Sequence, residues 1–167
     1  MLQNEMEKAL IDIYQLREQR RLRVTEQIGQ PLVQLSLNLP LGRQLPAGAD
    51  GLFAWGLRQM LDFMPQLLSC AHGHDRLGPW ALLGTANDAE TLKRQAVALE
   101  NAHPAGTLLD IDVYDQDGQK LLRKDLLLPA RQCPICHELE AECRRAERHS
   151  STELKTRIKK LLAPFRA

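Results

Sequence analysis

The chain has 167 residues, the length of one ordinary domain with a single hydrophobic core. Its 22 basic and 21 acidic residues leave a formal charge of +1, which excludes the global field of chains that bind nucleic acid or anionic membranes. No apolar run of about 18 residues occurs, and the N-terminal residues carry acids where a signal peptide has a basic flank. We therefore expect a cytoplasmic domain that contacts neither nucleic acid nor membrane.

The first half of the chain predicts two helices and two strands. Apolar residues at spacings of three and four predict an amphipathic helix over 2–23, which ends in a basic cluster. Alternating apolar and polar residues predict a strand over 31–40, and a second helix is expected over 51–70, where Pro65 should kink or end it. The Gly/His-rich residues that follow are typical of a loop, and residues 80–85 predict a short apolar strand.

A third helix is predicted in the middle of the chain. Asn87-Asp88 is a typical helix cap, and it precedes a helical segment over 89–101 that His103-Pro104 ends. Gly106 would let backbone amides approach a phosphate closely, whereas His103 is either a turn residue or a base.

The strongest hairpin signal is Asp117-Gly118, between alternating segments over 107–115 and 119–127. A two-residue turn there would place Asp112 opposite Arg123, and Asp110 opposite Asp125. One face of this hairpin would be apolar, and the other would carry four charges. The apolar face would consist of Leu109, Ile111, Val113, Leu122 and Leu126.

Two carboxylates, Asp110 and Asp112, would project side by side from this strand, close enough to share a divalent ion. Oxygen ligands favour magnesium over zinc, and magnesium would neutralise charge that develops in phosphoryl or nucleotidyl transfer. Arg123 would add a contact to a phosphate. The alternative is a solvent-facing sheet surface, whose Asp–Arg pairs contribute little to stability.

Four soft or borderline metal ligands lie within seventeen residues: Cys133, Cys136, Cys143 and His149. Three thiolates and one imidazole are typical of a closed, structural zinc site. Alternatively, the thiols pack beside a helix and His149 is exposed. His137 is another possible fourth ligand, although it directly follows Cys136, and Cys70 is interpreted as a buried or incidental thiol.

A basic helix is predicted over 151–162, with Ser151 as its cap. Together with the cysteines it defines a second functional class, a zinc-stabilised module that binds a partner protein or nucleic acid. Nucleic acid is disfavoured because about half of the helix surface is apolar. The apolar residues are Leu154, Ile158, Leu161 and Leu162.

Several separated motifs occur in one order along the chain: Asp88-Ala89-Glu90 with Leu92-Lys93, then ENAHPAGTLLDIDV over 100–113, then LPARQCPIC over 128–136. Together they resemble the apo-citrate lyase phosphoribosyl-dephospho-CoA transferases. The similarity covers nearly the whole chain, including the helix with Arg17-Glu18-Gln19-Arg20, the segment 38–43 and the spacing of the Cys/His ligands.

The resemblance implies that a serine of the apo acyl carrier subunit of citrate lyase attacks the α-phosphate of triphosphoribosyl-dephospho-CoA and that diphosphate leaves. Asp110 and Asp112 would bind magnesium. His103, or Glu100, which residue chemistry alone places on an exposed helix face, would accept the serine proton or position the nucleophile. The candidate phosphate contacts are Arg17, Arg20, Arg43, Lys93, Arg123 and Arg131.

Two positions depart from the family pattern, which usually has arginine where this chain has Thr107 and Gln132. A lost charge-assisted hydrogen bond costs about 1.5–3 kcal/mol, which would weaken donor binding without abolishing metal-dependent chemistry. A related carrier, such as that of malonate decarboxylase, is therefore an alternative partner.

The expected fold is α+β and nucleotidyltransferase-like, with a mixed or antiparallel sheet whose hairpin carries the Asp-x-Asp pair. Helices would flank the sheet, and a zinc-binding helical segment would form the C-terminal part. The expected organisation is a single transferase domain over 1–167, of which 129–167 is a zinc-stabilised subregion.

Overall fold

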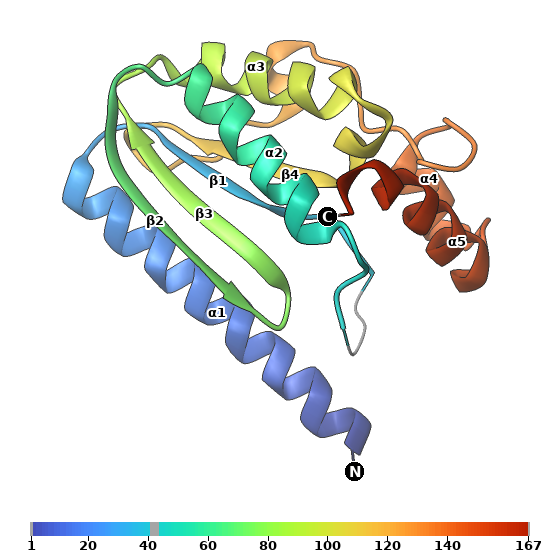
Figure 1. Ribbon diagram of the computed structural model, residues 1–167. Coiled ribbons are helices and arrows are strands. Elements are labelled where there is room, and N and C mark those ends of the chain that lie inside the picture. The colour runs from blue at the N-terminus through green and yellow to red at the C-terminus, as the bar shows by residue number, and fades with distance from the viewer. Residues whose placement is uncertain (1, 41–43, 167) are drawn as a thin grey trace.

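The computed structural model describes residues 2–40 and 44–166, with side chains from residue 8 onward. It is an α+β structure, as predicted (Figure 1). The helices and strands in chain order are α1 (Leu2–Ile28), β1 (Leu32–Leu37), α2 (Ala49–Asp62), β2 (Leu67–Asp75), β3 (Gly78–Thr85), α3 (Ala89–Ala102), β4 (Leu109–Tyr114), α4 (Glu140–Arg145) and α5 (Ser151–Leu162). Three short 3-10 helices complete it: η1 (Pro104–Leu108), η2 (Arg123–Leu126) and η3 (Ala163–Phe165).

The strands form one antiparallel sheet in the order β2-β3-β1-β4, so β4 lies at an edge. Strand β1 pairs with β4 in a register that places Gln34 opposite Asp112 and Ser36 opposite Asp110. Since opposite residues project to the same side of a sheet, these four side chains share one face.

The two faces of the sheet are covered differently (Figure 1). Helices α2, α3 and α5 pack on one face, where Leu35 and Ile111 belong to the large core. The C-terminal half of α1 crosses the other face and packs against a smaller cluster that includes Trp80 and Tyr114. Residues Asp110 and Asp112 alternate with the core residues of β4 and therefore lie on the α1 side.

Helix α1 contacts the sheet through different residues from those predicted. Within the apolar stripe, Leu16 is exposed, whereas Arg21, in the predicted basic cluster, is buried. The helix also continues to Ile28, beyond the predicted end at residue 23. The arginines therefore lie within the helix and face the sheet instead of marking its end.

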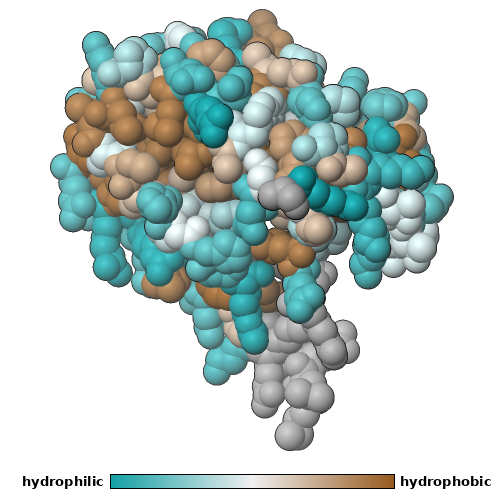
Figure 2. All heavy atoms as spheres, in the orientation of Figure 1, coloured by the Kyte–Doolittle hydropathy of each residue, from teal (hydrophilic) through white to brown (hydrophobic). Residues whose placement is uncertain are grey.

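The predicted second helix and the loop after it are partly wrong. Helix α2 ends at Asp62, and β2 begins at Leu67 inside the segment that was predicted to be helical. Pro65 is incompatible with a continuing helix, and a tight turn at Gly78, where φ is 102°, returns the chain into β3. Exposed residues at the end of α2 and the start of β2 coincide with brown spheres at the upper left of Figure 2: Phe63, Leu67 and Leu68.

The second strand of the predicted hairpin does not form. Only the pair Tyr114 and Lys120 makes a β-bridge, and residues 123–126 form η2 instead of a strand. The predicted cross-strand pairs Asp112–Arg123 and Asp110–Asp125 are therefore wrong, because β4 pairs with β1 on its other side.

The helix caps largely follow the sequence. Asp88 caps α3 by accepting the N–H of Thr91 at 2.8 Å, as expected. The α5 cap is Ser150 and not Ser151, because Ser150 and Glu153 form a capping box. No helix in the described part of the chain has the length and apolar character needed to cross a membrane.

Candidate functional site

The carboxylates of Asp110 and Asp112 lie on the same face of β4, two residues apart. The Asp110 side chain is 43% exposed and that of Asp112 is 17% exposed, so the pair lies in a partly open surface. Burial raises the pKa of Asp110, and the negative charge of Asp112 raises it further. A cation beside this pair would relieve both effects.

Two protein cations lie against the aspartates. The ammonium of Lys120 is 2.6 Å from Oδ2 of Asp112, and a guanidinium nitrogen of Arg131 is 3.5 Å from Oδ1 of Asp110. Each carboxylate therefore has its own positive partner. Lys120 was not among the residues that the sequence indicated.

Charged side chains cover the outer edge of β4, where the hairpin strand was predicted. Glu100 accepts the N–H of Ile111 at 3.1 Å, and Lys93 donates to the C=O of Ile111 at 3.2 Å. Arg131 donates to the C=O of Leu109 at 2.9 Å. Because these side chains satisfy the backbone of the edge, a further strand is not needed there.

Glu100 lies in the interior and is only 3% exposed, so its expected place on an exposed helix face is wrong. Its carboxylate forms ion pairs with Arg123 and, at 2.8 Å, with Arg131. Burial raises the pKa of Glu100, and the two guanidinium groups offset part of the rise. Lys93 is likewise buried, and burial lowers its pKa. Both residues thus have structural partners.

Arg131 joins the aspartate face to the cysteine segment. Besides Asp110, Glu100 and Leu109, its guanidinium donates to the C=O of Thr107 at 3.3 Å and lies 3.7 Å from the carboxylate of Glu140. The position of this side chain is therefore fixed from several sides at once.

The predicted phosphate contacts on α1 have protein partners in the structure. Arg17 makes a two-pronged contact with Asp75, at 2.8 and 2.6 Å, and donates to the C=O of Gly78. The guanidinium of Arg20 lies 4.9 Å from the ring centre of Trp80. Arg43 lies outside the described residues.

Arg21, which sequence reasoning did not select, lies nearer to the aspartate pair. It pairs with Glu18 at 2.5 Å and stacks 4.1 Å from the ring centre of Tyr114. Its Nη1 is buried without a hydrogen-bond partner among the described residues. The sequence signal was its place in the basic cluster, which does not distinguish it from its neighbours.

The segment from His103 to Gly106 turns the chain from α3 into β4. Nδ1 of His103 accepts the N–H of Ala105 at 3.0 Å, and the imidazole packs 5.7 Å from Trp55 and 5.3 Å from Phe165, between ring centres. The N–H of Gly106 donates to the C=O of His103 at 2.8 Å, so it has a partner inside the turn. The imidazole thus packs with rings that border the large core, whereas the aspartates face α1.

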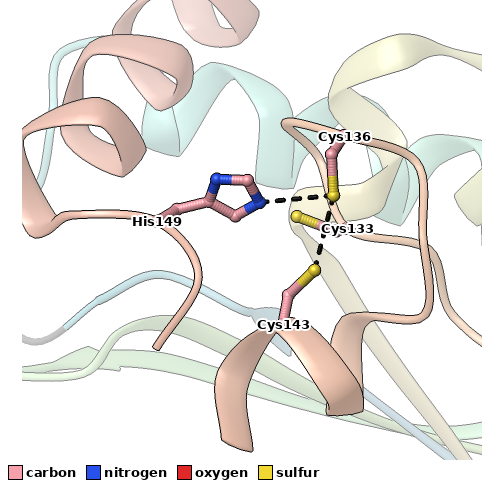
Figure 3. Close-up of side chains that lie close together, drawn as sticks. All are labelled: Cys133, Cys136, Cys143 and His149. Carbon is pink, nitrogen blue, oxygen red and sulfur yellow. Dashed lines mark hydrogen bonds between the residues drawn. The ribbon is translucent and has the colours of Figure 1, made fainter. Parts of the chain in front are cut away.

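The four ligand candidates at the C-terminal end converge (Figure 3). The sulfur atoms and one imidazole nitrogen of Cys133, Cys136, Cys143 and His149 all lie within 4.8 Å of one another. In tetrahedral zinc sites with Zn–S bonds of about 2.3 Å, sulfur atoms are about 3.8 Å apart, so this cluster could hold such an ion.

The chemistry of the cluster also suits a metal. The N–H of Glu138 and the imidazole of His149 lower the pKa of Cys136 to about 6, whereas burial and the neighbouring thiols raise that of Cys143 to about 12. A bound cation would favour the thiolate form of all three. His137, the other suggested ligand, is not part of the group, and Cys70 is exposed instead of buried.

The cysteine segment is attached to the sheet and to α5. Asn38, just beyond β1, donates to Glu140 at 3.1 Å, and Arg157 of α5 donates to the C=O of Pro134 at 2.8 Å. A cavity of about 670 Å³ lies beside the segment, and Asn38, Glu140 and Thr107 are among its lining residues. The same side chains therefore border the cavity and support Arg131.

Comparisons with known proteins agree with these features. The family model described as apo-citrate lyase phosphoribosyl-dephospho-CoA transferase matches residues 8–165. Proteins of that name from Escherichia coli O9:H4 (strain HS) and Shigella boydii serotype 18 are each 41% identical over 85 residues. That segment is 51% of this chain and 46% of each relative, so the match spans about half the length of these curated relatives.

Proposed function

Because the chain belongs to the apo-citrate lyase phosphoribosyl-dephospho-CoA transferase family, we propose that it transfers the phosphoribosyl-dephospho-CoA group to a serine of the apo acyl carrier subunit of citrate lyase. The observation that carries this proposal is the aspartate pair on one partly open face of β4, with Lys120 and Arg131 against it. The relatives' names supply the acceptor and the group, and the donor would be triphosphoribosyl-dephospho-CoA.

The reaction is a substitution at phosphorus. The serine oxygen forms a bond to the α-phosphorus of the donor, and the bond from that phosphorus to the oxygen bridging the β-phosphate breaks. Diphosphate leaves with the electron pair, and the serine proton passes to solvent or to the departing diphosphate. The protein need only hold the two substrates in line and stabilise the negative charge.

We propose that Asp110 and Asp112 would hold a magnesium ion, as in nucleotidyltransferase-type enzymes. The pair fits such a cation because Asp110 is open to solvent and because a protein ammonium already lies 2.6 Å from Asp112. When bound, the ion would neutralise charge on the phosphate oxygens. The carboxylates orient the ion, and Arg131 fixes Asp110.

The remaining candidates divide by their partners. Arg131 and Arg20 retain the geometry of phosphate contacts, since Arg131 borders Asp110 and Arg20 covers Trp80 without a carboxylate partner among the described residues. We propose positioning roles for Glu100 and His103. Both carboxylate oxygens of Glu100 are used in ion pairs, and the imidazole of His103 packs away from the aspartate face.

We propose that the Cys/His cluster holds a structural zinc ion. Four protein ligands close the coordination shell and leave no position for substrate, as in structural sites. The segment would then act by holding Arg131 and Glu140 against the sheet. On this view the chain is one transferase domain, with 129–167 as its zinc-stabilised part. The alternative of a zinc-stabilised binding module without catalysis is not favoured by the family match.

Mass spectrometry of the carrier tests the proposal. The protein is incubated with the triphosphoribosyl donor, magnesium and apo carrier, and the carrier should gain the mass of the phosphoribosyl-dephospho-CoA group. Asp110→Asn and Asp112→Asn should remove this gain, whereas Asp117→Asn, the same change at an exposed turn position, should retain it. The proposal is overturned if the wild-type protein leaves the carrier unmodified or if the two aspartate variants remain fully active.

A parallel reaction with the carrier of malonate decarboxylase tests partner identity. Thr107 and Gln132 stand where the family usually has arginine, and Thr107 lines the cavity beside the cysteine segment. A faster reaction with the citrate lyase carrier supports the proposed partner. A faster reaction with the malonate carrier would reassign the substrate and leave the reaction class unchanged.

A further inference from the structure

The ammonium of Lys120 lies in the position where a cation would contact Asp112. Its Nζ is 2.6 Å from Oδ2, although Lys120 comes from the turn after β4 and not from an element of the core. We propose that Lys120 is a built-in counter-ion that occupies Asp112 until a divalent cation displaces it, after which the ammonium serves the phosphate groups of the donor. This inference rests on the proposed metal site.

The two counter-ions of the aspartate pair differ in how firmly they are held. Arg131 also contacts Glu100, the C=O of Thr107 and the C=O of Leu109, so its guanidinium stays in place whether or not a cation binds. The side chain of Lys120 is 44% exposed, and Asp112 is its hydrogen-bond partner among the described residues. Lys120 is therefore the counter-ion that can leave.

The backbone beneath Lys120 is fixed while its side chain is not. The β-bridge to Tyr114 and the hydrogen bond from the N–H of Leu121 to the C=O of Val113, at 2.9 Å, hold the turn against β4. The ammonium can thus move about the flexible lysine stem without rearrangement of the chain. Glu18 on α1 lies close enough for the charge of Lys120 to contribute to the lowering of its pKa, after the larger effect of Arg21.

The exchange follows from electrostatics. A doubly charged ion and an ammonium cannot share one carboxylate oxygen at contact distance, so binding of the ion requires Lys120 to move. A phosphate chain that arrives with the ion brings negative charge to the same place, and the released ammonium can pair with it. Binding of the cation and binding of polyphosphate should therefore favour each other, and Lys120 should contribute to this coupling.

Manganese binding, measured by the loss of the free-ion electron paramagnetic resonance signal, tests the inference without any turnover. In Lys120→Met the competitor for Asp112 is absent, so manganese should bind about five- to tenfold more tightly than in the wild type. Lys124→Met is the matched control, since it removes the same charge from an exposed position in η2. It should change the affinity by less than about twofold, as expected for a screened surface charge.

Inorganic tripolyphosphate is the second probe. In the wild type it should tighten manganese binding further than it does in Lys120→Met, after correction for the complex that the two form in solution. The inference is overturned if Lys120→Met and Lys124→Met bind manganese equally, or if Lys120→Met binds it more weakly than the wild type. If the wild type modifies the carrier while these affinities are equal, the counter-ion role alone fails. If the wild type neither binds manganese nor modifies the carrier, the proposed function fails with it.

Discussion

The carboxylate of Glu100 accepts the main-chain N–H of Ile111 at 3.1 Å, so a helix side chain completes the hydrogen bonding of an edge strand. The same carboxylate pairs with Arg123 and Arg131. One buried acidic group thus connects α3, β4 and the two arginines that follow the strand. Its position on β4 is directly beside Asp110, which makes it a support for the aspartate face.

Replacement of Glu100 by glutamine should destabilise the protein. The amide can still accept the N–H of Ile111, but both arginines lose a charged partner in a largely buried place. We expect a loss of about 2–4 kcal/mol in the free energy of unfolding, measured by urea denaturation. Glu90→Gln, an exposed position on the same helix, is the control and should be neutral. A variant that keeps wild-type stability but loses carrier modification would instead favour a catalytic role for Glu100.

Gly106→Ala tests why glycine occupies the turn before β4. A Cβ at this position would lie 2.7 Å from the C=O oxygen of Glu100 and 2.8 Å from that of Leu99. Both oxygens belong to the backbone of α3 and cannot move independently, so we expect a loss of about 1–3 kcal/mol in unfolding free energy.

The control for this substitution is Gly29→Ala. There an added methyl group meets nothing within 4 Å, and the cost arises from a φ of 54° alone, about 1 kcal/mol. Thermal unfolding of both variants separates the two causes. An equal effect at the two positions would mean that the contact with α3 is not what requires glycine at position 106.

Arg17 and Asp75 should contribute stability that depends on pH. Burial by itself would raise the pKa of Asp75, but hydrogen bonds from Arg17 and from the N–H of Leu77 outweigh it and hold that pKa below its usual value. Asp75→Asn should therefore cost about 1–3 kcal/mol of unfolding free energy at pH 7. The stabilisation is complete above the pKa of the unfolded state, near 4, and is lost as the pH falls through the lower, folded-state pKa.

Urea unfolding at several pH values checks this prediction. The difference between wild type and Asp75→Asn should be constant from about pH 7 to pH 5 and should shrink toward about pH 3. Arg17→Met should remove most of the same energy, and the double variant should lose little more than either single one. A difference that persists unchanged at low pH would show that the carboxylate charge is not its source.

Local patterns in the sequence predicted the elements whose signals are complete within a few residues. Helix α3 has its cap at Asp88, β1 alternates along its whole length, and the spacing of the cysteines identified a cluster that the structure brings together. Strand β2 was missed because most of its residues are exposed and its pairing is supplied by β3, so no internal alternation marks it.

The hairpin failed for a different physical reason. Its turn signal at Asp117-Gly118 corresponds to a real turn, but the outer edge of β4 is satisfied by Lys93, Glu100 and Arg131. Side chains that come from distant parts of the chain leave no local pattern. For the same reason the sequence gave the charge of Lys120 without its partner.

Removal of metal from the cysteine segment should loosen the support of Arg131. The segment reaches the sheet through Glu140, which accepts from Asn38 at 3.1 Å and lies near Arg131, and Cys143 is in the same short helix as Glu140. Protein purified under reducing conditions should contain about one zinc ion per chain. Cys143→Ser should lose it, whereas Cys70→Ser, at an exposed cysteine outside the cluster, should keep it.

The structural consequence should appear as local unfolding. In Cys143→Ser, or in wild type treated with a strong chelator, amide hydrogen exchange should increase over residues 131–150 and then at the start of β4, because Arg131 donates to the C=O of Leu109 there. Strands β2 and β3 lie at the other side of the sheet and should keep their protection. Increased exchange confined to the cysteine segment would mean that the ion stabilises that segment without supporting the aspartate face. Unchanged exchange throughout, with zinc absent from the wild type, would remove the zinc proposal itself.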